Sequence, residues 1–266
     1  MRKVLAKKNP SKIRQPRVYP LDQQIQQLKV NDPINWGITP VFWAVFSVIA
    51  GLFIAIVLLV LYSLIFNEDT PKQNISMTLS AVATVFMAII ASKSVEKIAE
   101  RNDGWKTFGL RKLTLKQVGL ALITWVGFIV VNATLSTIFD ALKPGASDEG
   151  SNVPDFTKSM PIFVISFITI ALIAPIVEEF VFRGVILHTL LCKYSFWPSA
   201  IITSLIFALF HVMQVSTLTG SFVLGATLFV LAILLAYLCR ITGSIVPGMI
   251  VHGLSNGIAI ISAFYL

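Results

Sequence analysis

The stretch that decides the fold is residues 160–183, MPIFVISFITIALIAPIVEEFVFR. Its first part, Met160–Val177, carries no charged side chain, and two glutamates and an arginine follow it closely. The whole chain of 266 residues is 56% hydrophobic and only 13% charged, whereas soluble domains carry about 25% charged residues. A single soluble core could not bury uncharged runs of this length, so we interpret them as membrane spans.

Seven apolar stretches predict an all-α, polytopic transmembrane helix bundle with about seven spans. They are Val41–Phe66, Ile75–Ser92, Val118–Phe139, Met160–Val177, Ser199–Met213, Ser221–Cys239 and Ser244–Leu266. The sequence between the third and fourth stretches is rich in acidic residues and turn formers, which predicts an exposed, flexible linker. The predicted organisation is a basic, irregular, proline-containing arm (1–40), a three-span region (41–139), the linker (140–159) and a C-terminal bundle (160–266).

The distribution of lysine and arginine predicts the orientation. If all seven stretches cross the membrane, Lys72, Lys143 and Lys158 lie on one side, and the other 18 of the 21 basic residues lie on the opposite side. Cytoplasmic loops carry such an excess of positive charge. We therefore expect a cell-membrane protein with a cytoplasmic N-terminus, an extracytoplasmic C-terminus and a linker outside. The net charge of +8 is explained by this topology, and we predict no nucleic-acid partner.

Two glutamates and an arginine stand at the inner end of the fourth stretch. Glu179 and Arg183 are four residues apart, the spacing at which an acid and a base pair on a helix. Glu178 has no basic residue three or four positions later, so it is the carboxylate free to accept a proton as a general base. The alternative is that all three residues form a charge cluster at a helix end, without a catalytic role.

Two further pairs of residues share helical faces. Phe207 and His211 are four residues apart, as are His252 and Asn256. If the fourth helix continues and turns near Tyr194–Ser195, His211 reaches the depth of the glutamates. The side chains of Glu178, His211, His252 and Asn256 would then line one cavity that opens to the cytosol. Alternatively, the histidines and the asparagine are hydrogen-bonded residues that hold membrane helices together, and Phe207 only packs.

Two other ionisable residues of this half invite simpler interpretations. His188 is expected near the inner surface, as a solvated or interfacial side chain. Arg240 ends the sixth stretch and is expected to be an anchor whose charged end reaches the membrane surface.

The ordered motifs E-E-x-x-x-R, F-x-x-x-H and H-x-x-x-N on successive apolar stretches resemble the CAAX-processing and bacteriocin-processing (CPBP, or Abi) family of intramembrane proteases. The resemblance covers about residues 160–262. It implies a catalytic helix bundle in which Glu178 and His211 activate water, while His252 and Asn256 stabilise the oxyanion. Glu179 and Arg183 would support these residues.

The resemblance implies a glutamate-dependent endopeptidase that acts on membrane-associated peptides or protein tails. A metal-free mechanism is favoured, although Glu178, His211 and His252 are also a possible zinc ligand set. Two other functions stay open: a non-catalytic bacteriocin-immunity or membrane scaffold protein, and a proton-coupled transporter. The transporter alternative predicts an inverted repeat, and the sequence shows none.

Overall fold

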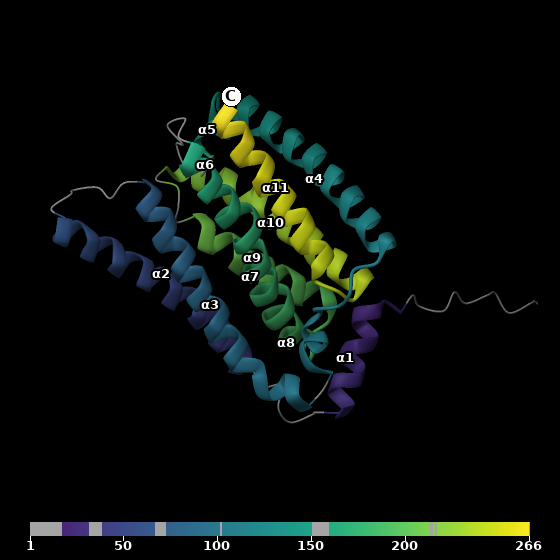
Figure 1. Cartoon of the computed structure of the whole chain (residues 1–266). Helices are drawn as coiled ribbons and strands as arrows, with labels where there is room; N and C mark the ends of the chain where they lie inside the picture. Colours follow the sequence, from purple (N-terminus) through teal and green to yellow (C-terminus); the bar gives the residue numbers. More distant parts are fainter. Residues whose placement is uncertain are drawn as a thin grey trace, which may run out of the picture.

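The computed structural model describes residues 18–31, 39–66, 73–101, 103–150, 160–212, 215 and 217–265. In these residues the chain forms helices and no strand, which confirms the predicted all-α membrane bundle (Figure 1). The long helices are α1 (Pro20–Asn31), α2 (Thr39–Phe66), α3 (Gln73–Arg101), α4 (Leu115–Leu142), α9 (Phe196–Val212), α10 (Leu218–Thr242) and α11 (Val246–Tyr265).

Five helical segments among the described residues are long and apolar enough to cross a membrane. They are Thr39–Leu58, Leu115–Leu142, Phe163–Leu191, Leu218–Thr242 and Val246–Tyr265. The other two predicted spans correspond to α3 and to the shorter apolar helix α9. The helices α2 and α3 pack together as a hairpin against the central helical segment, whereas α4 lies against α10 and α11.

The central helical segment runs from Met160 to Leu191 and includes two π-helical stretches. It consists of α6 (Met160–Ser166), the π-helical η2 (Phe167–Ile173), α7 (Ala174–Glu179), the π-helical η3 (Phe180–Leu187) and α8 (His188–Leu191). A π-helical turn bonds residue i to i+5, so it displaces carbonyl groups from the regular ladder. Side chains bond two carbonyls in these turns: Asn256 Nδ2 donates to the Ile170 oxygen, and His188 Nδ1 donates to the Arg183 oxygen.

After Leu191 the chain turns and returns as α9, as the sequence predicted. On the other side, glycines bring α11 close to the central segment. A Cβ atom on Gly253 would lie 2.7 Å from the Ala171 oxygen, and one on Gly248 would lie 2.9 Å from Glu179 Oε2. Small residues of this kind let membrane helices approach closely, and here they bring the His252 helix against the two glutamates.

The predicted irregular arm is wrong for residues 18–31. These residues form α1, whose Leu21 and Ile25 side chains are buried. Pro20 is the first residue of the helix, a position at which a proline has no backbone hydrogen bond to lose. Residues 1–17 and 32–38 lie outside the described residues.

The predicted flexible linker is wrong for residues 140–150. Here α4 ends and the short helix α5 (Ala146–Glu149) packs against α10. Ala146 is buried, and Asp140 accepts hydrogen bonds from the backbone and the hydroxyl of Ser147. Lys143 bonds to Glu149 and to Thr219, which ties the corner to the start of α10. The rest of the predicted linker, 151–159, lies outside the described residues.

Candidate active site

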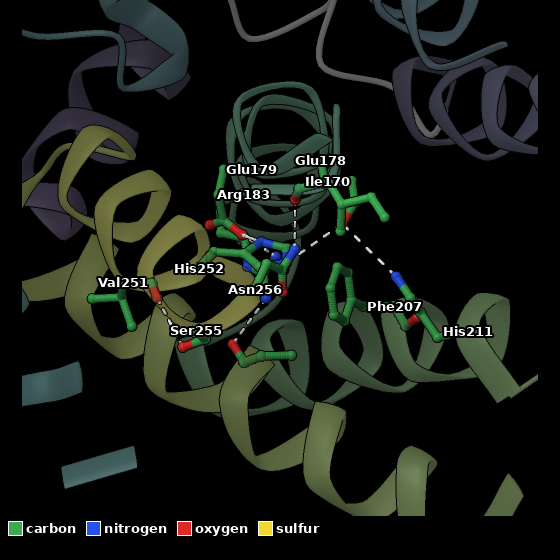
Figure 2. Close-up of polar contacts among 11 residues, drawn as sticks. Ile170, Glu178, Glu179, Arg183, Phe207, His211, Val251, His252, Ser255 and Asn256 are labelled. Carbon is green, nitrogen blue, oxygen red and sulfur yellow. Dashed lines mark hydrogen bonds and ion pairs between the residues drawn. The ribbon is translucent and has the colours of Figure 1, made fainter. Parts of the chain in front are cut away.

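Three helices bring three ionisable side chains together around one oxygen atom. Glu178 stands on α7, His211 near the end of α9 and His252 on α11. Glu178 Oε2 lies 3.8 Å from His211 Nε2 and 3.7 Å from His252 Nε2. Figure 2 shows the Glu178 carboxylate between the two rings. The geometric part of the sequence hypothesis, that these residues meet at one depth, agrees with the structure.

The hydrogen bond of the His211 ring orients its second nitrogen. His211 Nδ1 lies 2.8 Å from the Phe207 carbonyl oxygen, one helical turn earlier. Since a carbonyl oxygen only accepts, Nδ1 carries the proton, and in the neutral ring Nε2 presents a lone pair. That lone pair faces Glu178 Oε2, which is also an acceptor. Two acceptors 3.8 Å apart form no direct hydrogen bond, but a water molecule between them could donate to both.

The second glutamate forms a buried ion pair. Glu179 Oε1 lies 2.6 Å from an Arg183 guanidinium nitrogen, and each side chain is only 1% exposed. Arg183 also donates to the Ala232 carbonyl and lies over the Phe207 ring at 4.8 Å. The i, i+4 pairing predicted from the sequence is therefore present. It leaves Glu178 outside the pair, as the spacing indicated.

His252 lies between the two carboxylates. Its Nδ1 atom is 3.4 Å from Glu179 Oε1, and its Nε2 atom is 3.7 Å from Glu178 Oε2. The His252 side chain is 3% exposed, whereas those of Glu178 and His211 are 18% and 17% exposed. The exposed edge of the site is therefore on the side of Glu178 and His211.

Asn256 lies one helical turn after His252 on α11. Its Nδ2 atom donates to the Ile170 carbonyl of the π-helical η2, at 2.9 Å (Figure 2). This bond fixes the amide plane next to the central helical segment. Because Nδ2 carries two hydrogens, the amide can donate a second hydrogen bond.

Phe207 is fully buried among the polar residues of the site. Its ring centroid lies 4.5 Å from that of His211 and 5.7 Å from that of His252. It therefore contacts both imidazoles as well as Arg183. Phe207 thus packs against the polar residues of the site.

Four polar atoms of the site are buried and have no hydrogen-bond partner in the structure. They are Glu178 Oε2, Glu179 Oε2, Arg183 Nε and His252 Nδ1. Buried polar atoms of native proteins are nearly always paired with protein or water. Of these atoms, Glu178 Oε2 faces both imidazole nitrogens. A water molecule beside this oxygen would supply the missing hydrogen bond.

The residues expected as possible zinc ligands are chemically suitable, since zinc binds carboxylate oxygen and imidazole nitrogen. No group of three or more His, Cys, Asp or Glu side chains close enough to hold a metal ion is found in the described part of the chain.

One interpretation of the sequence is wrong at the residue scale. His188 is not interfacial: it is fully buried and bonded through Nδ1 to the Arg183 carbonyl, at 2.6 Å. The sequence also did not indicate the partners of Arg240. This residue pairs with Asp22 of α1 at 2.9 Å, and its guanidinium lies over the rings of Tyr19 and Phe196. Neither contact has a sequence signal, because each depends on a partner brought by the fold.

Comparison with known proteins identifies the region that holds this site. Residues 160–258 match the family model described as type II CAAX prenyl endopeptidase Rce1-like. An uncharacterized 24.3 kDa protein of Escherichia coli is 38% identical over 64 residues, which are 23% of this chain and 30% of that protein. The chain thus matches less than a third of the length of this curated relative. No solved structure matches. The family match includes every candidate residue from Glu178 to Asn256.

Proposed function

We propose that this chain, whose residues 160–258 match the type II CAAX prenyl endopeptidase Rce1-like family model, hydrolyses peptide bonds with Glu178 as its general base. The substrates are membrane-associated peptides or protein tails that reach the site from within or beside the bilayer. The observation that carries the proposal is the position of Glu178 Oε2, which is buried, unpaired and 3.7–3.8 Å from two imidazole nitrogens.

The first step is the activation of water. A water molecule between Glu178 and His211 is held by the two acceptors and gives a proton to Glu178 as its oxygen attacks the peptide carbonyl. His211 stays in place because Nδ1 donates to the Phe207 carbonyl. The carboxylic acid formed on Glu178 then returns the proton to the leaving amine, so that the base is restored.

The second requirement is a set of donors for the developing oxyanion. The Glu179 carboxylate, held by Arg183, faces His252 Nδ1. The His252 Nε2 atom, 3.7 Å from Glu178 Oε2, lies next to the reacting water and is the proposed donor. The second hydrogen of Asn256 Nδ2 supplies another donor, in an orientation set by the Ile170 carbonyl.

We propose this mechanism without a metal ion. It is supported by the hydrogen-bond directions, which give each group a role in proton transfer or oxyanion binding. Metal analysis of the purified protein tests it, together with activity after treatment with a chelator. Stoichiometric zinc that is lost together with activity would replace this mechanism by a metal-dependent one.

Membrane proteomics of cells that produce the wild type or Glu178→Ala tests the proposed activity. We expect uncleaved precursors to accumulate in Glu178→Ala and in His211→Ala, because neither variant can activate water. The matched control is Glu96→Ala, which removes an exposed carboxylate that pairs with Lys93 on the same helix.

The two possible outcomes are distinct. Precursors that accumulate in the site variants but not in the control support the proposal, provided that all variants reach the membrane at equal levels. Identical peptide patterns in all strains would contradict it and favour the non-catalytic immunity or scaffold function.

A further inference from the structure

A short segment outside the residues that match the family model contacts two helical segments of the candidate site. One segment carries the two glutamates, and the other carries His252. Residues 103–111 connect α3 to α4 and include the short helix η1 (Gly104–Phe108). We call them the 103–111 brace. Thr107, Phe108 and Gly109 within it are buried, although a connection between helices normally runs over the protein surface.

The brace first contacts the turn that leads into α11. The Gly109 carbonyl oxygen accepts two hydrogen bonds, from the Ser244 hydroxyl and from the Ile245 backbone N–H, each at 3.0 Å. Ser244 and Ile245 are both fully buried. His252 follows two helical turns later, so these bonds fix the starting point of the helix that carries it.

The brace also contacts the helical segment that carries the glutamates. Phe108 is fully buried, and its ring packs edge-on against Phe180, which directly follows Glu179. Trp105 packs against the same ring. A Cβ atom on Gly184 would lie 3.1 Å from the Phe108 carbonyl oxygen. The brace therefore lies directly on η3, within two turns of the Glu179–Arg183 pair.

The contacts around Gly109 leave no room for a side chain at this position. It has a left-handed backbone, with φ of +82°. A Cβ atom there would lie 2.9 Å from the Ile245 Cγ2 atom, 3.2 Å from the Ile245 backbone nitrogen and 3.6 Å from a His188 ring carbon. A side chain at this position presses on the Ile245 side chain and on its backbone nitrogen, which lie at the start of α11.

We propose that the 103–111 brace sets the distance between the His252 helix and the two glutamates, with Phe108, Gly109 and Ser244 as positioning residues. The inference rests on the proposed function, because it assigns these residues to the geometry of that reaction. The separations it controls are His252 Nδ1 to Glu179 Oε1, 3.4 Å, and His252 Nε2 to Glu178 Oε2, 3.7 Å. A displacement of about 1 Å in such a site can lower the rate on the order of 100-fold.

The chain offers a matched pair of variants for the test. Gly104 lies in the same brace and is also left-handed, with φ of +58°, but a Cβ atom there would have no neighbour within 4 Å. Gly104→Ala therefore reproduces the backbone strain without the steric contact. The substrate for the assay is a precursor identified by the membrane proteomics. With it, we expect Gly109→Ala to lower kcat on the order of 100-fold with KM unchanged, and Gly104→Ala to leave both constants near the wild-type values.

Two further variants keep the test decisive if Gly109→Ala folds poorly. Ser244→Ala removes one of the two bonds to the Gly109 carbonyl and should lower kcat, without affecting KM. In the double variant Gly109→Ala/Ile245→Leu, the Cγ2 methyl group is gone, so kcat should recover relative to Gly109→Ala. Equal kcat values for Gly109→Ala and Gly104→Ala, or a change in KM alone, would overturn the inference.

A structural measurement separates this inference from the proposed activity. Experimental structures of the wild type and Gly109→Ala should show a longer separation between His252 Nδ1 and Glu179 Oε1 in the variant. This readout holds even if no peptide is cleaved by the wild type, which would contradict the proteolytic function alone. An unchanged separation would overturn the role of the brace, whatever the activity.

Discussion

At the scale of single residues, Asn256 and its neighbour Ser255 form a matched pair that tests the proposed oxyanion site. Asn256 Nδ2 reaches across to the Ile170 carbonyl, whereas the Ser255 hydroxyl donates to the Val251 carbonyl of its own helix. We expect Asn256→Ala to lower kcat about 10²–10³-fold, the usual cost of losing an oxyanion donor, with a small effect on KM. Ser255→Ala should cleave at the wild-type rate. Steady-state kinetics in proteoliposomes measures both, and an active Asn256→Ala enzyme would remove the asparagine from the mechanism.

The buried ion pair of Glu179 and Arg183 should behave differently in stability and in activity. Arg183→Met leaves the Glu179 carboxylate buried without a cation, which typically costs about 3–5 kcal/mol. Replacing both residues, in Glu179→Leu/Arg183→Met, should restore most of that stability because neither member of the pair is left as an unpaired charge. It should not restore proteolysis, since His252 Nδ1 has lost the carboxylate that faces it.

Thermal unfolding in detergent and a cleavage assay check these two expectations separately. A double variant as unstable as Arg183→Met would show that the pair stabilises the fold through more than its charge. A double variant with wild-type activity would show that Glu179 has no role in orienting His252.

The pairing of Glu179 with Arg183 could be predicted from the sequence because both residues lie on one helix, where spacing determines proximity. The positions of Glu178, His211 and His252 also followed, once one turn after the fourth helix was assumed. The environment of His188 did not follow. Its partner is the Arg183 carbonyl in a π-helical turn, and no pattern of residue types in the sequence predicts such a turn.

The corner between α4 and α5 gives a prediction at the scale of elements. The Lys143 side chain, hydrogen-bonded to Glu149, holds the pKa of that carboxyl below its ordinary value of 4.5, and the Thr217 hydroxyl adds to the effect. A carboxyl with a lowered pKa in the folded state stabilises the fold above its unfolded pKa. That contribution is lost as the pH falls through the lowered folded value.

Glu149→Gln tests this pH dependence. At pH 7 we expect the variant to have a slightly lower Tm than the wild type, and the difference should disappear as the pH falls below 4.5 toward the lowered pKa. Glu96→Gln is the control, since its exposed partner Lys93 lies on the same helix. A difference that persists at low pH would mean that Glu149 stabilises the corner through packing rather than charge.

The elements that the sequence missed share a physical cause. The sequence of α1 is mostly polar, and the sequence near α5 is rich in turn formers. The few apolar residues that pack there, such as Leu21 and Ala146, therefore give no recognisable pattern. Each segment bonds to a residue far away in the sequence: Asp22 of α1 pairs with Arg240, and Lys143 beside α5 bonds to Thr219. Local composition predicts irregular structure in such segments, whereas the tertiary contacts select a helix.

At the scale of the whole molecule, the candidate site lies between the two ends of the central helical segment. Glu178 and Arg183 stand on a continuous helical segment from Met160 to Leu191, and both ends of this segment extend well beyond the site. The reaction proposed here needs water at that depth, so the membrane side from which water enters matters. The sequence predicts a cytoplasmic N-terminus and a site open to the cytosol, from the placement of 18 of the 21 basic residues.

Labelling of single cysteines tests that orientation over the whole molecule. Lys193 lies in the turn between α8 and α9, and Lys143 lies directly after α4. The predicted topology places these two residues on opposite sides of the membrane. Both are exposed. In a background that lacks Cys192 and Cys239, a membrane-impermeant maleimide added to intact cells should label Lys143→Cys but not Lys193→Cys. Both should react after permeabilisation. The reverse pattern in intact cells would invert the topology and would require the water that reaches Glu178 to be supplied from the outer side.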